Sequence, residues 1–412
     1  MKRRWLIVIA AILLLAAGVA AAGVYVWKQR HPGSIRGSAS TEFETGEAPG
    51  ATTRPAEELR ELPWPTFGYD NARSRYAPFD HRPPFRQLWI ARGRALIEFP
   101  PVVAYKRLFV STIKGRFLAI NRKTGRIVWV KQLDRCVAAS PAVADGVVYQ
   151  PVMDPWPCDK HEKNEAGFLV AMYAETGEEL WRFRTGVTES PPLIIDGTIY
   201  FGSWDGKMYA LDAETHQVKW TFQTGDQVKD AAAYWKGAIY FGSYDGKVYA
   251  LDAHTGKERW SASGVANFYA SPAVAYGRVF IGNTDGRVYA FGAKSGDLLW
   301  ARATGGYVYS SAAVWERTIF AGSYDGRFYG LDAATGDVKW RFDSKGPISG
   351  SPVVLDGVVY FSTLKSRTFG LDARNGKKIW EFPDGEYNPL VADEKRVYLI
   401  GRQRIYGVKP SE

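Results

Sequence analysis

The sequence predicts an all-β protein, an eight-bladed β-propeller with four-stranded blades, preceded by one N-terminal transmembrane helix. Three features predict it: a tryptophan that recurs about every 40 residues, hairpin turns between short apolar runs, and one long apolar run near the N-terminus. The 412 residues include 42 Gly and 15 Trp, and 46% of them are hydrophobic. Such a chain can close many tight turns around a large core.

The apolar run spans the 23 residues from Trp5 to Trp27 and follows the basic residues 2–4. At ~1.5 Å per residue, a helix of this length crosses the ~30 Å hydrocarbon core of a bilayer. The positive-inside rule keeps residues 1–4 as a cytoplasmic stub and exports the rest. We therefore expect residues 5–27 to form a signal-anchor helix in the cytoplasmic membrane. The small residues 20–23 leave a cleavable signal peptide as the alternative, and both interpretations place the remaining chain outside the cytoplasm.

Residues 28–62 are rich in Gly, Ser, Thr, Pro and Glu, with few large apolar residues. This composition predicts a flexible extracytoplasmic stalk, followed by the propeller over residues 63–412. The formal net charge is +10, which either favours anionic partners, such as an acidic envelope polymer or protein, or only keeps the domain soluble. Basic residues do not occur in clustered runs, so we expect no nucleic-acid partner.

The repeat itself predicts the blades. Its markers are Trp89, Trp129, Trp181, Trp220, Trp260, Trp300, Trp340 and Trp380. Five of the seven intervals between them are 40 residues long, and the others are 39 and 52 residues. Each unit holds four short apolar runs separated by turns such as 244–246 (Tyr-Asp-Gly) and 255–256 (Thr-Gly). Four strands in ~40 residues is the period of a propeller blade, and we expect the tryptophans to dock neighbouring blades.

The two ends of the chain complete the last blade. With the strands of a blade named A to D from the channel outward, seven complete sets end at Trp129 through Trp380. After Trp380 the chain supplies strands A, B and C, and before the first set a lone D strand carries Trp89. Pairing these ends would leave no open sheet edge. The sequence therefore predicts an eighth blade that joins the strand around Trp89 to the strand around Tyr406.

Two kinds of segment carry a family resemblance. The stretches "GLDAATGDVKW" (330–340) and "ALDAHTGKERW" (250–260) resemble the quinoprotein-type repeat, in which Trp stacks between blades over the peptide of the Gly turn. The segment "WPTFGYDNARSRYAP" (64–78) resembles the leading segment of pyrroloquinoline-quinone-dependent alcohol dehydrogenases. The same repeat occurs in the non-catalytic BamB family of outer-membrane assembly lipoproteins. Tyr173 and His216 depart from the Asp and Gly that the repeat usually has, which puts the geometry of those two turns in doubt.

Two further motifs have structural explanations. The S-[WY]-D-G sequences at 203–206, 243–246 and 323–326 are typical of hairpin turns between strands B and C. Cys136 and Cys158 are the two cysteines of an exported chain, and Cys158 lies in an insertion that replaces the B–C turn of the second blade. We expect a disulfide that anchors this insertion. A redox or metal pair with His161 is the alternative, although metal sites usually have more ligands.

The residues that start each strand A should ring the channel mouth on one face of the propeller. These positions vary between blades while the framework does not, as expected of a binding site. The polar and aromatic ones are Glu98, Glu189, Lys229, Asp230, Tyr269, Tyr309, Glu386 and Tyr387. The alternative is that these groups are polar only because a propeller mouth is wet.

The sequence favours a non-catalytic, monomeric scaffold that binds envelope proteins or anionic polymers, with no cofactor and no metal. The resemblance implies a rival: a quinoprotein oxidoreductase that uses pyrroloquinoline quinone and Ca²⁺, with Glu98 or Glu189 as a calcium ligand. Three features speak against it: no adjacent cysteines, no assignable Asp base, and short loops over the mouth. An exported sensor module is a third interpretation, which the four-residue cytoplasmic stub disfavours.

Overall fold

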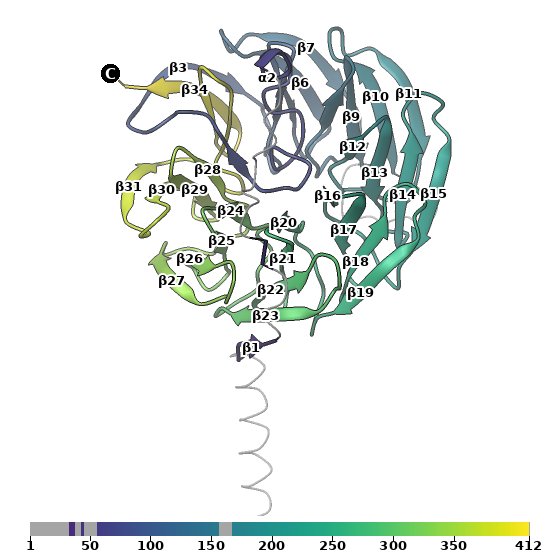
Figure 1. Ribbon diagram of the computed structural model, residues 1–412. Coiled ribbons are helices and arrows are strands. Elements are labelled where there is room, and N and C mark those ends of the chain that lie inside the picture. The colour runs from purple at the N-terminus through teal and green to yellow at the C-terminus, as the bar shows by residue number, and fades with distance from the viewer. Residues whose placement is uncertain (1–32, 38–42, 45–55, 156–166, 412) are drawn as a thin grey trace, which may run out of the picture.

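The computed structural model describes residues 33–37, 43–44, 56–155 and 167–411. Eight sheets, each built on four antiparallel strands, surround a central axis, and each belongs to one blade (Figure 1). The eight-bladed, all-β propeller predicted from the repeat is therefore confirmed. We number the blades 1 to 8 in the order of their innermost strands.

The strands of equivalent position have similar lengths in all blades. Strand A is β4 (Val102–Ala104), β8 (Ala142–Ala144), β12 (Leu193–Ile195), β16 (Ala233–Trp235), β20 (Ala273–Ala275), β24 (Ala313–Trp315), β28 (Val353–Leu355) and β32 (Leu390–Ala392). Strand B is β5 (Arg107–Ser111), β9 (Val147–Val152), β13 (Thr198–Gly202), β17 (Ala238–Gly242), β21 (Arg278–Gly282), β25 (Thr318–Gly322), β29 (Val358–Thr363) and β33 (Val397–Ile400).

Strand C is β6 (Arg116–Asn121), β10 (Phe168–Tyr173), β14 (Lys207–Asp212), β18 (Lys247–Asp252), β22 (Arg287–Gly292), β26 (Arg327–Asp332), β30 (Arg367–Asp372) and β34 (Arg404–Pro410). Strand D is β7 (Ile127–Gln132), β11 (Glu179–Arg184), β15 (Val218–Gln223), β19 (Glu258–Ser263), β23 (Leu298–Ala303), β27 (Val338–Asp343), β31 (Lys378–Phe382) and, for blade 8, β3 (Phe85–Arg92).

Burial follows strand position. Strands B and C are buried along nearly their whole length, as in β13 and β17, because neighbouring blades cover both faces of the sheet. Strand D lies on the outer wall and mostly exposes its residues, as in β7 and β15. We call the face with the B–C turns and the loops between blades the top face, and the face with the A–B and C–D turns the bottom face.

The chain ends close the ring as predicted. Strand β3 pairs antiparallel with β34, and Ile90 lies opposite Tyr406. Figure 1 shows the purple-blue β3 beside the yellow β34. The Trp89 ring lies against Gly125 of blade 1 and 5.8 Å from the ring of Tyr398. The closure therefore completes the sheet of blade 8 and also packs this blade against blade 1.

The repeat tryptophans contact the next blade along the chain. Trp300, for example, donates a hydrogen bond from Nε1 to the carbonyl oxygen of Ala333 at 3.2 Å, and its ring lies over Gly336. Gly336 has φ +71°, a conformation that glycine adopts without strain. In blade 3, His216 stands where the repeat usually has the turn glycine. It adopts the same left-handed conformation, with φ 60°, and its ring lies 4.5 Å from that of Trp181. The turn geometry is thus kept despite the substitution.

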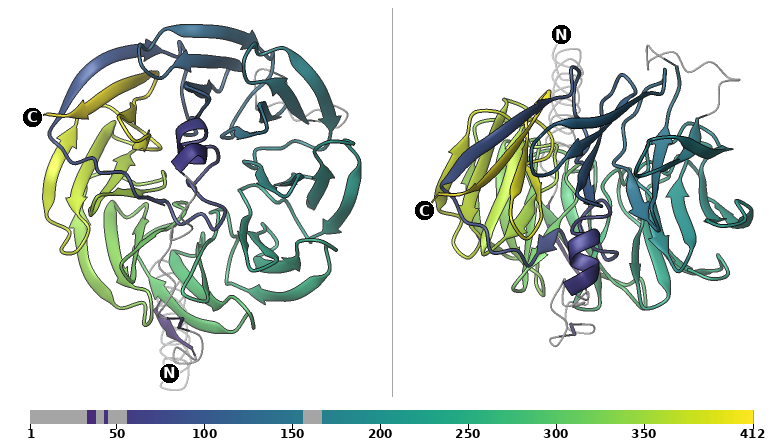
Figure 2. Two further views of the ribbon diagram at one scale, coloured as in Figure 1. Left: turned by 45° about the horizontal axis from the view of Figure 1, so that its top comes forward. Right: turned by 90° about the horizontal axis from the view of Figure 1, so that it is seen from above.

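Residues 64–81, which we call the inner segment, run around the inside of the ring and contact strand A or its flanks in every blade. Backbone or side-chain hydrogen bonds join Trp64 to Val103, Pro65 to Val143, Thr66 to Pro192, Asn71 to Tyr234, Ala72 to Val274, Ser74 to Val314, Arg75 to Val354 and His81 to Asp393. Part of it forms β2 (Tyr76–Ala77), which adds in parallel to β28. The sequence did not predict this arrangement, because the segment is not periodic. Figure 2 shows this part of the chain near the centre of the ring.

Several described parts of the expected stalk contact the propeller. Strand β1 (Ile35–Arg36) pairs with the outer strand β23, and helix α2 (Ala56–Glu61) precedes the inner segment. The ring of Phe43 stacks on Tyr276 at 5.2 Å. Strand pairing and aromatic contact supply order that composition alone does not predict. Within the described ranges no helix is long and apolar enough to cross a membrane, and the predicted span 5–27 lies outside those ranges.

The predicted disulfide lies partly outside the described residues. Cys136 is fully buried, and its backbone exchanges hydrogen bonds with Asp154 and Met153, of 2.8 and 2.9 Å. These contacts bring the start of the blade 2 insertion beside Cys136. Cys158 and His161 belong to the segment 156–166, which is not described, so the bond stays a prediction.

Candidate functional site: the channel mouth

The predicted mouth residues lie on the loops between blades on the top face, just before each strand A. Glu189 is nearly buried and forms the centre of one group. Its carboxylate accepts a hydrogen bond from Trp204 Nε1 at 3.1 Å and lies 3.7 Å from Lys229 Nζ. The Lys229 ammonium also lies over the rings of Trp204 and Tyr244, at 3.9 and 4.5 Å from their centroids. Carboxylate and aromatic faces thus hold this ammonium in place.

Burial changes the acidity of the mouth carboxyl groups. It raises the pKa of Glu189 to about 7, a shift that Lys229 opposes and Glu98 adds to. The pKa of Glu98 is also raised, first by burial and then by the negative charge of Glu386. Carboxyl groups that share a poorly solvated site resist ionising together. Of these groups, Glu189 is the one whose pKa is raised to near neutral pH.

Two buried groups of opposite charge, Asp230 of the mouth and Arg75 of the inner segment, act on one another. The Asp230 carboxylate accepts main-chain hydrogen bonds from Ala231 at 2.7 Å and from Ser271 at 3.0 Å, and burial raises its pKa. Arg75 of the inner segment is fully buried over the ring of Phe67, and burial lowers its pKa to about 9. Among the described residues, Nε and Nη2 of Arg75 have no hydrogen-bond acceptor. The inner segment thus contributes a cation that the sequence did not assign to the channel.

One side of the mouth is aromatic. Tyr269 and Tyr309, both predicted, make an edge-to-face contact with centroids 5.1 Å apart. They belong to a larger group, the tyrosine cluster, which consists of Tyr244, Tyr269, Tyr307, Tyr309 and Tyr324. Tyr307 is 54% exposed, and Val265, in the corresponding loop between blades 4 and 5, is 69% exposed. This side of the mouth therefore offers the Tyr307 ring to solvent, backed by four partly buried tyrosine rings.

The remaining predicted residues lie apart from that surface. Glu386 pairs with Arg402 at 3.1 Å, and Glu98 accepts a hydrogen bond on its main-chain oxygen from Asn388 at 2.9 Å. Burial raises the pKa of Tyr387 to about 12, with further contributions from Glu98 and Glu386. The mouth thus has an acidic side at blades 8 and 1 and an aromatic side at blades 4 to 6.

Four aromatic residues of the mouth were not predicted from the sequence, namely Trp204, Tyr244, Tyr307 and Tyr324. Three of them are the second residue of an S-[WY]-D-G turn. The motif also shapes the turn, as predicted: Asp205 accepts hydrogen bonds from the Lys207 amide and the Tyr209 hydroxyl, at 3.0 and 2.6 Å. An aromatic residue repeated at one variable position of this turn was the signal that could have revealed this surface.

The geometry of the mouth suits binding. In the described part of the chain, no three His, Cys, Asp or Glu side chains are grouped so that they could hold a metal ion. The carboxylates of Glu189 and Asp230 are already engaged by Lys229 and by main-chain amides, respectively. Aromatic rings beside a few polar groups supply contact area and orientation to a bound molecule.

Comparisons with known proteins agree with the repeat. The family model described as outer membrane protein assembly factor BamB matches residues 81–152, 163–233, 227–311 and 285–411. BamB of Yersinia pestis is 27% identical over 153 residues, which cover 33% of this chain and 35% of that protein. The quinohemoprotein alcohol dehydrogenase of Comamonas testosteroni is 32% identical over 224 residues, or 45% of this chain and 30% of that enzyme. The matched part thus spans about a third of each of these relatives.

The fold is also that of solved structures. The crystal structure of BamB from Moraxella catarrhalis superposes with a TM-score of 0.64 at 15% identity, covering 79% of this chain and 98% of that one. At this identity the likeness speaks for the fold alone. Together with the sequence matches, it confirms the resemblance to the quinoprotein-type propeller repeat.

Proposed function

Because this chain belongs to the family described as outer membrane protein assembly factor BamB, we propose that it is an extracytoplasmic, membrane-tethered scaffold without catalytic activity. In this proposal the top face binds an envelope protein through the channel mouth. The inner segment lines the channel below, so the mouth is the face on which variable side chains meet solvent.

The tyrosine cluster carries the proposal. Tyrosine and tryptophan are enriched in protein interfaces, because a rigid ring buries much area and loses little conformational entropy. Here five tyrosines from consecutive blades lie with neighbouring ring centroids 5.0 to 6.3 Å apart, and Tyr307 is 54% exposed. Lys229 and Glu189 beside them supply a polar pair that can orient a partner.

A quinoprotein oxidoreductase is the second candidate, favoured by the 32% identity to the quinohemoprotein alcohol dehydrogenase. The mouth residues do not fit its cofactor. Pyrroloquinoline quinone is a tricarboxylate, whereas the described residues here include four acidic ones, Glu98, Glu189, Asp230 and Glu386. The two cations at the mouth, Lys229 and Arg402, already pair with Glu189 and Glu386, and Arg75 lies buried near Asp230. Like charges at this spacing would repel such an anion. We therefore derive no reaction step through a quinone.

The test compares two exposed tyrosines in full-length protein expressed in its native membrane. Tyr307→Ser removes the exposed ring at the mouth, and Tyr173→Ser removes a ring that is 49% exposed at a C–D turn of the bottom face. Quantitative cross-linking and mass spectrometry should show a partner lost from Tyr307→Ser and kept by Tyr173→Ser. Charge reversal at Glu189 is a poorer probe, because it would place two ammonium groups together in a poorly solvated site.

Equal recovery of every cross-linked protein by the two variants would contradict the mouth as the binding surface. A separate assay addresses the enzyme: purified protein is mixed with pyrroloquinoline quinone, Ca²⁺, alcohols or sugars, and an artificial electron acceptor. We expect no turnover above the protein without cofactor, and sustained turnover would favour the oxidoreductase.

A further inference from the structure

Several blades neutralise the basic residue that begins strand C. An aspartate two residues earlier, in the B–C turn, lies within ion-pair distance of it in blades 3, 5 and 6. These pairs are Asp205 with Lys207 at 4.0 Å, Asp285 with Arg287 at 2.6 Å and Asp325 with Arg327 at 3.6 Å. The same aspartate accepts a hydrogen bond from the tyrosine two residues into the strand, as Asp325 does from Tyr329. The charge at this corner of the repeat is therefore balanced locally.

This balance is lost on both sides of the ring closure. Strand C begins with Arg404 in blade 8 and with Arg116 in blade 1, but the aspartate positions hold Arg402 and Lys114 instead. Each turn thus replaces a negative charge by a positive one. The strand-C tyrosine of blade 8, Tyr406, bonds instead to Asp384, from the loop that leaves blade 7.

Blade 7 shows how such a turn can be compensated. It too has a basic residue, Lys365, at the aspartate position. Its first strand-C residue, Arg367, nevertheless pairs with Glu381 of the neighbouring strand D. The charge in blade 7 is therefore balanced by another residue of the same blade.

The closure brings further arginines to the corner of blades 8 and 1. Arg92 at the end of β3 lies directly opposite Arg404 across the β3–β34 pair. The next residue, Gly93, donates its amide to the carbonyl oxygen of Gln403 at 2.8 Å and accepts a hydrogen bond from Arg116 Nη1 at 3.2 Å. Like charges directly opposite each other destabilise a strand pair, so this arrangement costs stability. We call Arg92, Arg94, Arg116, Arg402 and Arg404 the arginine sector.

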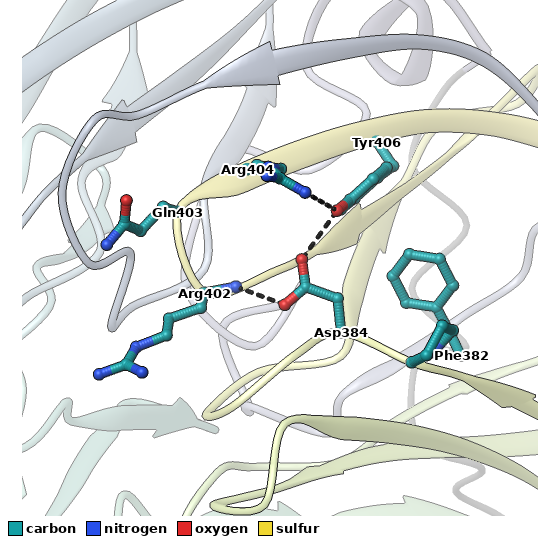
Figure 3. Close-up of a pocket in the computed structure, with 7 residues that line it drawn as sticks. Phe382, Asp384, Arg402, Gln403, Arg404 and Tyr406 are labelled. Atoms are coloured by element: carbon teal, nitrogen blue, oxygen red, sulfur yellow. Dashed lines mark hydrogen bonds between the residues drawn. The ribbon is translucent and has the colours of Figure 1, made fainter.

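A pocket opens beside two residues of this sector, Arg402 and Arg404. Its volume is about 510 Å³, and it is lined by Phe382, Pro383, Asp384, Arg402, Gln403, Arg404 and Tyr406 (Figure 3). The Asp384 carboxylate is occupied by the Arg402 amide at 3.0 Å and by the Tyr406 hydroxyl at 2.8 Å. Arg402 pairs with Glu386, whereas Arg92, Arg94 and Arg404 have no carboxylate within ion-pair distance among the described residues. Arg404 Nη1 donates a hydrogen bond to the Tyr406 hydroxyl at 3.5 Å. At the pocket itself Asp384 and Glu386 offset Arg402 and Arg404, so the excess of positive charge belongs to the wider sector, through Arg92, Arg94 and Arg116.

We propose that the arginine sector is a binding site for a phosphate group. Guanidinium groups bind phosphate oxygens through paired hydrogen bonds, and several of them together favour an anion with more than one charge over a single carboxylate. A pocket of this size suits a small molecule or a headgroup, and the ring of Phe382 gives it an apolar wall. The phosphate comes from a soluble phosphate ester or from a phospholipid headgroup. This site is separate from the mouth and does not depend on the scaffold function.

The test uses full-length protein in phosphatidylcholine nanodiscs and measures binding of inorganic phosphate and glycerol phosphate by calorimetry. We expect saturable binding that Arg404→Gln weakens at least about tenfold and that Arg92→Gln weakens less. Arg327→Gln is the matched control, because Arg327 holds the same place in blade 6 but is paired with Asp325. It should leave the affinity unchanged.

A second arm identifies the source of the phosphate. If the site takes a lipid headgroup, discs that contain phosphatidylglycerol should lower the apparent affinity for soluble phosphate, and if it takes a soluble ester they should not. Three results would overturn the proposal: absence of saturable phosphate binding, equal loss in Arg327→Gln and Arg404→Gln, or succinate binding as tight as phosphate binding. The last would indicate a carboxylate site.

Discussion

The guanidinium of Arg73 donates a hydrogen bond from Nε to the main-chain carbonyl of Ala232 at 2.9 Å and so ties the inner segment to the innermost strand of blade 4. Arg73 is fully buried, and its other nitrogens reach Thr66, Phe67 and Pro192. We predict that Arg73→Met lowers the free energy of unfolding by about 2–4 kcal/mol, because four buried acceptors lose a charged donor. Urea denaturation measures the change.

The control for this prediction is Arg341→Met on the outer wall, where Arg341 is exposed. That variant should stay within about 0.5 kcal/mol of the parent protein. Equal stability of the two variants would mean that the inner segment adds little to the folded state.

The contact between Gly336 and Trp300 yields a matched pair of glycine substitutions. Gly336 and Gly146 both have positive φ, +71° and +77°, so Ala costs ~1 kcal/mol at either position. A Cβ at Gly336 would also come within 2.6 Å of the Trp300 ring, whereas one at Gly146 would meet nothing within 4 Å. We predict that Gly336→Ala is less stable than Gly146→Ala by about 1–3 kcal/mol. Equal melting temperatures would contradict close blade docking at this turn.

Stability should fall as the pH rises from about 4.5 to about 7, because burial raises the pKa of Glu189 from its ordinary value of 4.5 to about 7 in the folded protein. In that window the folded state keeps a proton that the unfolded state has lost, so the stabilisation present below pH 4.5 disappears toward pH 7. Burial also raises the pKa of Glu98, which acts in the same direction.

This contribution of Glu189 amounts to about 3 kcal/mol across the window. Glu189→Gln cannot titrate, so its denaturation midpoint should vary less between about pH 5 and about pH 8 than that of the parent protein. Parallel pH profiles of the two proteins would show that Glu189 ionises normally in the folded state.

We predict a disulfide between Cys136 and Cys158. In the chain-entropy treatment, a bond that closes the loop from residue 136 to residue 158 stabilises the folded state by ~3 kcal/mol. The protein isolated from its native envelope should show no reactive thiol when it is unfolded without reductant, and two after reduction. Two reactive thiols before reduction would exclude the bond.

The blades could be predicted from the sequence because each blade is a local repeat. Turns, strand alternation and the docking Trp recur within ~40 residues, and even the break at His216 keeps the glycine-like backbone. The closure was also predictable, since a missing strand after Trp380 matched an extra strand around Trp89.

Features built by chain segments distant in sequence could not be read from the pattern. The inner segment contacts the blades mainly through its backbone. Many sequences can make such contacts, so the residue types of the segment do not predict its path. Arg92 and Arg404 are separated by most of the chain and meet through the closure alone. The mouth was found in part, because strand starts could be aligned, whereas Tyr244 and Tyr324 were assigned only to turns.

The path of the inner segment has a consequence for biosynthesis. Its contacts run in the same order as the blades, from Trp64 at blade 1 to His81 at blade 8. The segment leaves the ribosome before any blade, so each blade can add its innermost strand to a partner that is already present. Contacts between residues far apart in the sequence are slow to form. An inner segment that is synthesised first would let these contacts form one blade at a time. Nascent chains truncated after successive blades should then resist protease progressively further along residues 64–81.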